Sequence, residues 1–216
     1  MLFRSIVWEE TTTNGTTDVY AQRFSPQHRA RWSRPGICVS CFRGNQSYPR
    51  VVPAGDDGVF VVWQSDSAGK DNINIWCQRI APDGTHAWQT PLPVCVAPGN
   101  QTRPAVASDI DGGILVAWED TRRGDTDIYG QYVQYDGSPT GSEDGVPVEV
   151  APGEQTGVKF TRDTNGVVTG VSWLDKFSPM QPAARVETDL SKLPIPEPAG
   201  FLAAAAAAAL LIRRRF

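Results

Sequence analysis

The residues best suited to chemistry are few in this sequence. Its cysteines and histidines are Cys38, Cys41, Cys77, Cys95, His28 and His86. Cys38 and Cys41 form a CxxC pair, which suits a metal ion, a redox centre or a local disulfide. Because a structural zinc site usually takes four ligands, often from two such pairs, and the sequence holds one pair, we favour structural thiols or a disulfide over a metal or redox site.

Carboxylates are the second candidate group, and they recur shortly after four tryptophans, as Glu10, Asp66, Asp120 and Asp175. Such acids could line a loop face and hold a cation such as calcium. Turn formation explains them more simply, so we expect no metal and no cofactor, with calcium in these loops as the alternative. We find no nucleophile motif, phosphate-binding loop or metal-ligand cluster in the sequence and therefore expect no catalytic residues.

The charge of the chain argues against a nucleic-acid partner. The 216 residues carry a formal net charge of −4, and without the three C-terminal arginines this becomes −7. Nucleic-acid binding relies on a basic face that neutralises phosphates, and no basic stripe with interleaved aromatic residues precedes the C-terminal tail. We exclude this class of function.

The elements that would position these residues form a repeat. Trp8, Trp63, Trp118 and Trp173 are each 55 residues apart, in the contexts "SIVWEE", "FVVWQS", "LVAWED" and "GVSWLD". Upstream of two of them, "GNQSYPRVV" and "GNQTRPAVA" keep the same spacing. Internal periodicity of this length is typical of propellers and solenoids.

Each unit predicts four short strands, as in "RPAVASD", "ILVAWED", "DIYGQYV" and "VPVEV". Aromatic or branched residues alternate with polar ones, and Asp-Gly pairs mark the tight turns. A unit of this size cannot bury both faces alone and must stack on its neighbours. The sequence therefore predicts an all-β fold with about three to four four-stranded antiparallel blades of an incomplete propeller.

The repeated large side chains are expected to be structural. We predict that Trp8, Trp63, Trp118 and Trp173 form the repeat core between adjacent blades. The repeated glutamines, Gln22, Gln78 and Gln131, are expected to tie one strand to another.

The stretch "WEDTRRGDTDIYGQ" at 118–131 resembles a family of bacterial extracellular propeller-like repeats, which carry Trp-x-Asp-x-Arg followed by Asp-Ile-Tyr-x-Gln. The equivalent stretches of the first two units depart from the pattern and lack the arginine. The resemblance implies an exported protein built of propeller blades.

Three segments follow from these patterns: repeats over 1–175, a linker over 176–195 and a tail over 196–216. The first unit begins at its second strand, and the fourth loses the repeat pattern after Trp173. Closed propellers typically have four to eight blades. We therefore expect the sequence to be a fragment that lacks upstream blades and an export signal.

The tail reads "PEPAGFLAAAAAAALLIRRRF". Its apolar run, 199–212, is shorter than the roughly 20 residues that usually cross a bilayer. Its order is more informative: a Pro-rich stretch, an apolar run that we expect to be a membrane helix, and Arg213, Arg214 and Arg215 at the end. The positive-inside rule places such arginines in the cytoplasm.

This order resembles the PEP-CTERM sorting signal, with Pro196, Glu197 and Pro198 matching its motif and the three arginines matching its basic anchor. The resemblance implies that an exosortase-type membrane peptidase is a partner and processes the chain near the motif. The protein would be membrane-anchored during export and then lie at the cell surface or outside the cell.

Two functions remain at this point. Our main interpretation is a non-enzymatic, exported surface or matrix protein whose blades bind a polysaccharide or a surface partner. The alternative is a glycan-active enzyme, sialidase-like or of another hydrolase type. Such an enzyme needs a carboxylate pair or an arginine cluster at the blade centre. Because no unit carries an acid that stands out from the repeat, we expect that the chain is not an enzyme.

Overall fold

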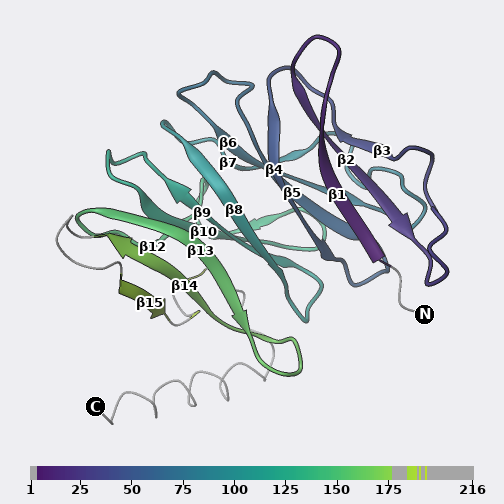
Figure 1. Ribbon diagram of the computed structural model, residues 1–216. Helices are drawn as coiled ribbons and strands as arrows, with labels where there is room; N and C mark the ends of the chain where they lie inside the picture. The colour runs from purple at the N-terminus through teal and green to yellow at the C-terminus, as the bar shows by residue number, and fades with distance from the viewer. Residues whose placement is uncertain (1–3, 177–183, 189, 191–192, 194–216) are drawn as a thin grey trace.

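The computed structural model describes residues 4–176, 184–188, 190 and 193, and these form an all-β fold of four antiparallel sheets (Figure 1). Blade 1 contains β1 (Arg4–Thr11), β2 (Thr17–Phe24) and β3 (Ile37–Ser40). Blade 2 contains β4 (Gln46–Pro53), β5 (Val59–Ser65), β6 (Asn74–Ile80) and β7 (Leu92–Cys95).

Blade 3 contains β8 (Gln101–Ser108), β9 (Ile114–Asp120), β10 (Asp127–Val133) and β12 (Val146–Glu149), with the short β11 (Pro139–Thr140) beside β10. Blade 4 contains β13 (Glu154–Arg162), β14 (Val168–Lys176) and β15 (Ala184–Thr188). The four strands expected from the third repeat are therefore confirmed, and each repeat forms one sheet.

The sheets stack through one row of strands, which we call the inner row: β1, β4, β8 and β13. Each of these strands contacts the next one in the row, as Figure 1 shows for β4, β8 and β13. Between neighbouring sheets lie three apolar clusters, which include Trp63, Trp118 and Trp173. Stacking buries the faces that a single sheet would leave in water, as expected for blades.

The repeated tryptophan is buried in blades 2, 3 and 4, and Trp118 is 0% exposed. Trp8 is only half-buried, so it does not share the core burial predicted for the repeated tryptophans. The reason lies in strand order. In blades 2 and 3 the tryptophan strand is covered by a preceding strand, β4 or β8, whereas β1 is the edge of its sheet.

Each repeated glutamine, on β2, β6 or β10, ties its strand to the loop that follows it. The side-chain amides of Gln78 and Gln131 donate to the carbonyl oxygens of Trp88 (3.0 Å) and Ser142 (2.8 Å). Gln22 also accepts a hydrogen bond from the backbone N–H of Trp32 at 2.9 Å. The expected structural role of these buried side chains is confirmed.

The C-terminal predictions are mostly outside the described residues. The helix expected at 199–212 lies there, and no helix in the described part of the chain has the length and apolar character needed to cross a membrane. Within the expected linker, 176–195, the structure contains β15, whose Val186 pairs with Trp173 of β14. This segment extends the last sheet because β14 offers it an open edge.

Candidate functional site

The inner row contains an unusual backbone position in three successive blades. Tyr48 of β4 and Arg103 of β8 have φ values of 54° and 51°, and Gly157 of β13 has a φ of 69°. Each lies at a shift in the strand register, so it is a β-bulge. Residues with side chains rarely adopt this left-handed region, and where they do the conformation often marks a functional site.

Side chains from the preceding blade hold these bulges in place. The N–H groups of the three bulge residues each donate over 2.8 Å to a side-chain oxygen. The acceptors are Oε1 of Glu9 for Tyr48, Oε1 of Gln64 for Arg103, and Oε1 of Glu119 for Gly157. All three acceptors follow the repeated tryptophan directly. The blades are therefore joined by one repeated contact, which places these side chains along the inner row.

A charged cluster extends from this contact in blade 3. Nη1 of Arg103 lies 3.0 Å from Oε2 of Glu119, which is 3% exposed. The Glu119 carboxylate raises the pKa of Arg103, and the Tyr48 side chain contributes to the same shift. The side chain of Arg103 is 57% exposed. The Arg103 guanidinium is thus held in place by Glu119 on one side and is open to solvent on the other.

We call the five side chains of this region the central cluster: Glu9, Tyr48, Gln64, Arg103 and Glu119. Glu9 and Tyr48 are exposed, and both acids accept from bulge N–H groups. The cluster combines two carboxylates with a guanidinium and a phenol. It can bind hydroxyl groups through several donors and acceptors and can exchange a proton at the exposed carboxylate.

The acids predicted from the sequence have other roles. Asp120 accepts from Nε1 of Trp118 at 2.8 Å and from Nη2 of Arg122 at 2.6 Å. Burial of the Arg122 guanidinium lowers its pKa, but the hydrogen bond and charge of Asp120 raise the pKa of Arg122 overall. Asp66 binds the side chain of Asn45 at 2.8 Å. Among the described residues, no group of three or more His, Cys, Asp and Glu could hold a metal ion. Calcium in these loops was the alternative to turn formation, and it stays untested.

The two remaining sequence acids contact side chains of their own blades. Glu10 accepts from Nε1 of Trp8 at 3.2 Å, and Asp175 accepts from the amide of Gln155 at 3.3 Å. They belong to the tryptophan side of the strands and not to the central cluster.

The cysteines divide into two kinds. Cys38 and Cys41 form a disulfide with a Cα–Cα distance of 6.1 Å, in agreement with the interpretation that we favoured. Cys77 and Cys95 are free and buried. Burial raises the pKa of Cys95 to about 12, and it also raises the pKa of Cys77. Neither thiol is therefore a nucleophile at neutral pH.

Sequence reasoning missed the central cluster. The prediction relied on an acid that occurs in one unit alone, whereas Glu9 and Glu119 lie at the same place in two units. The sequence did contain a signal, because "WE", "WQ" and "WE" place Glu9, Gln64 and Glu119 directly after the repeated tryptophan. Side chains alternate between the two faces of a strand, so this position lies on the opposite face from the tryptophan. The predicted tail residues (Pro196, Glu197, Pro198, Arg213, Arg214 and Arg215) lie outside the described residues.

Comparison with known proteins relates this fold to a class of enzymes. No family model and no curated protein matches the sequence. Among solved structures, the chain is similar to an endo-arabinase from Bacteroides thetaiotaomicron, with 13% identity, a TM-score of 0.51, and coverage of 91% of this chain and 72% of that one. It is also similar to a thermostable family-43 glycoside hydrolase, with 11% identity, a TM-score of 0.54 and coverage of 90% and 73%.

A third similar structure is an α-L-arabinofuranosidase from Lactobacillus brevis, with 15% identity, a TM-score of 0.51 and coverage of 91% and 73%. These likenesses establish a shared propeller-like fold. They contradict our expectation that the chain is not an enzyme, because the proteins named here with this fold cleave glycosidic bonds. The fold likeness therefore favours the glycan-active alternative over the non-catalytic scaffold.

Proposed function

We propose that this protein is a glycan-active propeller that hydrolyses glycosidic bonds, with the central cluster as its active site. The observation that carries the proposal is the repeated bulge contact of the inner row, which places Glu9 at Tyr48 and the Glu119–Arg103 ion pair in the same row. The fold likeness to an endo-arabinase and an α-L-arabinofuranosidase supports arabinose-containing polysaccharides as the substrate class. Because fold alone does not decide function, the proposal stands on the chemistry of the cluster.

Glycoside hydrolysis requires two carboxylic groups, one to protonate the leaving oxygen and one to activate water or attack the sugar. Glu9 is exposed, and one of its oxygens accepts from Tyr48, so its other oxygen is available to exchange a proton. We assign it the role of general acid and base. Glu119 is buried and held in place by Arg103 and Gly157, and we assign it the role of the second carboxylate.

Arg103 and Tyr48 would bind the sugar hydroxyls. The guanidinium of Arg103 has five N–H donors in a fixed plane, and Glu119 engages one side of it. Its exposed side can donate to substrate oxygens. The bulges at both residues turn the strand locally and present these side chains to solvent.

We further propose that the protein is exported and then processed by an exosortase-type peptidase at Pro196, Glu197 and Pro198. The order of the tail and its terminal arginines support this. The disulfide between Cys38 and Cys41 is in keeping with an oxidising compartment. A polysaccharide substrate outside the cell would be accessible to the protein in that location.

A substrate screen tests the activity. The purified full-length chain is incubated with arabinan, arabinoxylan, xylan and a sialylated glycan, and released reducing sugar is measured. We expect release from a pentose-containing polymer and none in a parallel reaction with Glu9→Gln. Equal release by both proteins, or no release from any polymer by folded protein, would contradict the proposal.

A further inference from the structure

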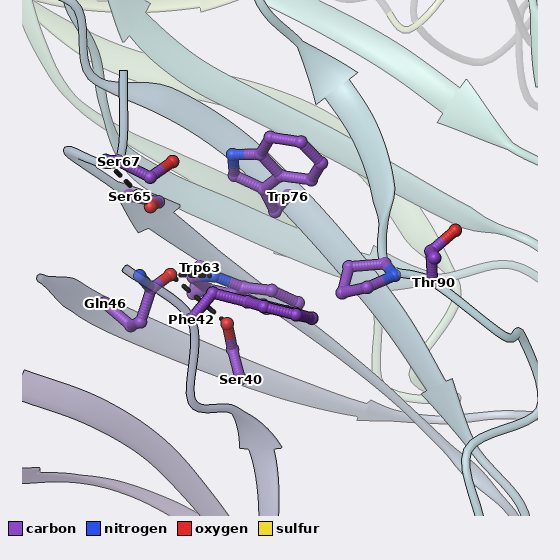
Figure 2. A pocket seen from close by; sticks show the side chains of 9 residues that line it. Ser40, Phe42, Gln46, Trp63, Ser65, Ser67, Trp76 and Thr90 are labelled. Carbon is purple, nitrogen blue, oxygen red and sulfur yellow. Dashed lines mark hydrogen bonds between the residues drawn. The ribbon is translucent and has the colours of Figure 1, made fainter. Parts of the chain in front are cut away.

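A pocket lined by residues other than the central cluster lies between blades 1 and 2. It has a volume of about 210 Å³ and is lined on one side by Trp76 and on the other by Trp63 and Phe42, as Figure 2 shows. Ser65, Ser67 and Thr90 contribute hydroxyl groups to its wall. We call it the lateral pocket. Phe42 is 59% exposed, so the pocket has a wall that faces solvent.

The internal repeat shows what fills the same place in blade 3. There the Arg122 guanidinium lies 4.0 Å from the centre of the Tyr129 ring. It donates to Asp120, to the carbonyl oxygen of Asp144 at 2.9 Å and to Sγ of Cys95 at 3.1 Å. The side chain thus closes the gap between blades 2 and 3 with a stacked planar group.

Blade 2 has the aromatic ring of this arrangement but lacks the ion pair. Trp76 takes the place of Tyr129, since each pairs with the repeated tryptophan of its own sheet. Ser65 and Ser67 take the places of Asp120 and Arg122, two and four residues after that tryptophan. Two short hydroxyl side chains replace a salt bridge, and this difference opens the lateral pocket.

The charges around the lateral pocket argue against a cationic ligand. In blade 3 the Asp120 carboxylate neutralises Arg122, whereas blade 2 has the hydroxyl of Ser65 at the position of Asp120. Arg43 also donates from Nη2 to the carbonyl oxygen of Ser67 at 3.1 Å, which puts a positive charge at the rim. A buried cation without a partner is costly. The pocket therefore suits a neutral group with a flat apolar face.

We propose that the lateral pocket binds one neutral sugar ring of a glycan, with the apolar face of the ring against Trp76. Aromatic walls match that face, and the hydroxyls of Ser65, Ser67 and Thr90 match the ring substituents. Nε1 of Trp76 is buried and has no partner among the described residues, so it is an additional donor. The volume is below that of pockets for drug-sized ligands, which are at least about 300 Å³, and fits a single ring.

This site is separate from the central cluster and uses none of its residues. It would hold a glycan chain at a distance from the point of cleavage. Like the proposed function, this proposal assumes a sugar as the ligand, but it rests on the contacts of different residues. Binding at one site can therefore fail without affecting the other.

The test follows the indole N–H signal of Trp76 by NMR during titration with methyl β-D-xylopyranoside and methyl α-L-arabinofuranoside. We expect a saturable shift with at least one sugar, and roughly tenfold weaker binding in Trp76→Ala by saturation-transfer measurements. The double variant Ser65→Asp/Ser67→Arg copies blade 3 and fills the pocket with its own guanidinium. It should lose the shift while keeping the fold.

Two controls separate the explanations. Glu9→Gln should keep the Trp76 shift, whatever happens to turnover, because it lies in the central cluster. If the double variant fails to fold, Ser67→Leu blocks the same space without adding charge and should also lose the shift. Absence of a shift with both sugars, a shift with N-acetylarginine amide in place of the sugars, or a shift that survives pocket filling would overturn the proposal.

Discussion

Glu119 links blades 3 and 4 through its two carboxylate oxygens, and Arg103 extends this link to blade 2. It accepts from Gly157 of blade 4 and Arg103 of its own blade, while Arg103 N–H contacts Gln64 of blade 2. We predict that Glu119→Gln folds with a loss of about 1 kcal/mol, since blade 2 uses a glutamine in this position. Glu119→Leu should cost about 2 kcal/mol, because Gly157 and Arg103 both lose an acceptor. Urea unfolding of the two variants measures the difference.

Equal stability of the glutamine and leucine variants would show that the bulge contact contributes nothing. Blade 4 supplies a natural contrast, since Leu174 stands at this position and cannot accept a hydrogen bond. Glu10→Gln is the matched control, because its carboxylate contacts Trp8 rather than a neighbouring blade.

Asp56 gives a pH-dependent prediction. Burial would raise its pKa, but hydrogen bonds from Gly58 and Tyr135 and the charge of Arg79 lower it overall. A carboxyl with a lowered pKa in the folded state stabilises the fold above its unfolded pKa, near 3.8, and loses this contribution as the pH falls through the folded pKa. We expect Asp56→Asn to cost about 1 kcal/mol at pH 7 and progressively less below pH ~4.

The Asp56 measurement is urea unfolding of wild type and Asp56→Asn at a series of pH values. A difference that stays constant down to pH ~2 would mean that the ion pair with Arg79 is not its source. Asp57→Asn serves as a control, since its side chain is 78% exposed and its contact with Arg23 is long, at 4.0 Å.

At the scale of the strand, equivalent tryptophans differ in burial because their sheets differ in completeness. Trp63 is 1% exposed on β5, which has β4 and β6 on its two sides, whereas Trp8 is half-buried on the edge strand β1. We predict that Trp63→Ala costs about 3–5 kcal/mol and Trp8→Ala less than half of that. Thermal or urea unfolding of the pair checks this. Equal losses would mean that β1 is covered in solution.

The strands of blade 3 could be predicted from the sequence because alternation, Asp-Gly turns and the repeat all agree there. The inner-row bulges could not, since a left-handed Tyr48 or Arg103 depends on an acceptor from the preceding blade and not on its own propensity. The lateral pocket was also beyond prediction. The missing arginine of the second repeat was visible, but the space that it leaves depends on how blades 1 and 2 pack.

At the scale of the whole molecule, the proposed sorting tail predicts a change in mass. In a host with an exosortase, the mature protein should lack the residues that follow the Pro196–Pro198 region. Replacing Arg213, Arg214 and Arg215 with serine should reduce processing, because the cytoplasmic anchor is lost. Intact-mass analysis of the exported protein measures this. Full-length chain ending at Phe216, recovered free outside the cell, would show that the tail is no sorting signal.

The central claim is that the inner row carries a glycosidase active site, and turnover by matched acid variants tests it most directly. Hydrolysis of the best pentose polymer is measured for wild type, Glu9→Gln and Glu10→Gln at equal folded concentration. We predict that Glu9→Gln lowers kcat by about 10²–10⁴-fold, as expected for loss of a general acid or base, and that Glu10→Gln keeps at least half of the activity. Unchanged turnover in Glu9→Gln, or equal losses in both variants, would contradict the account.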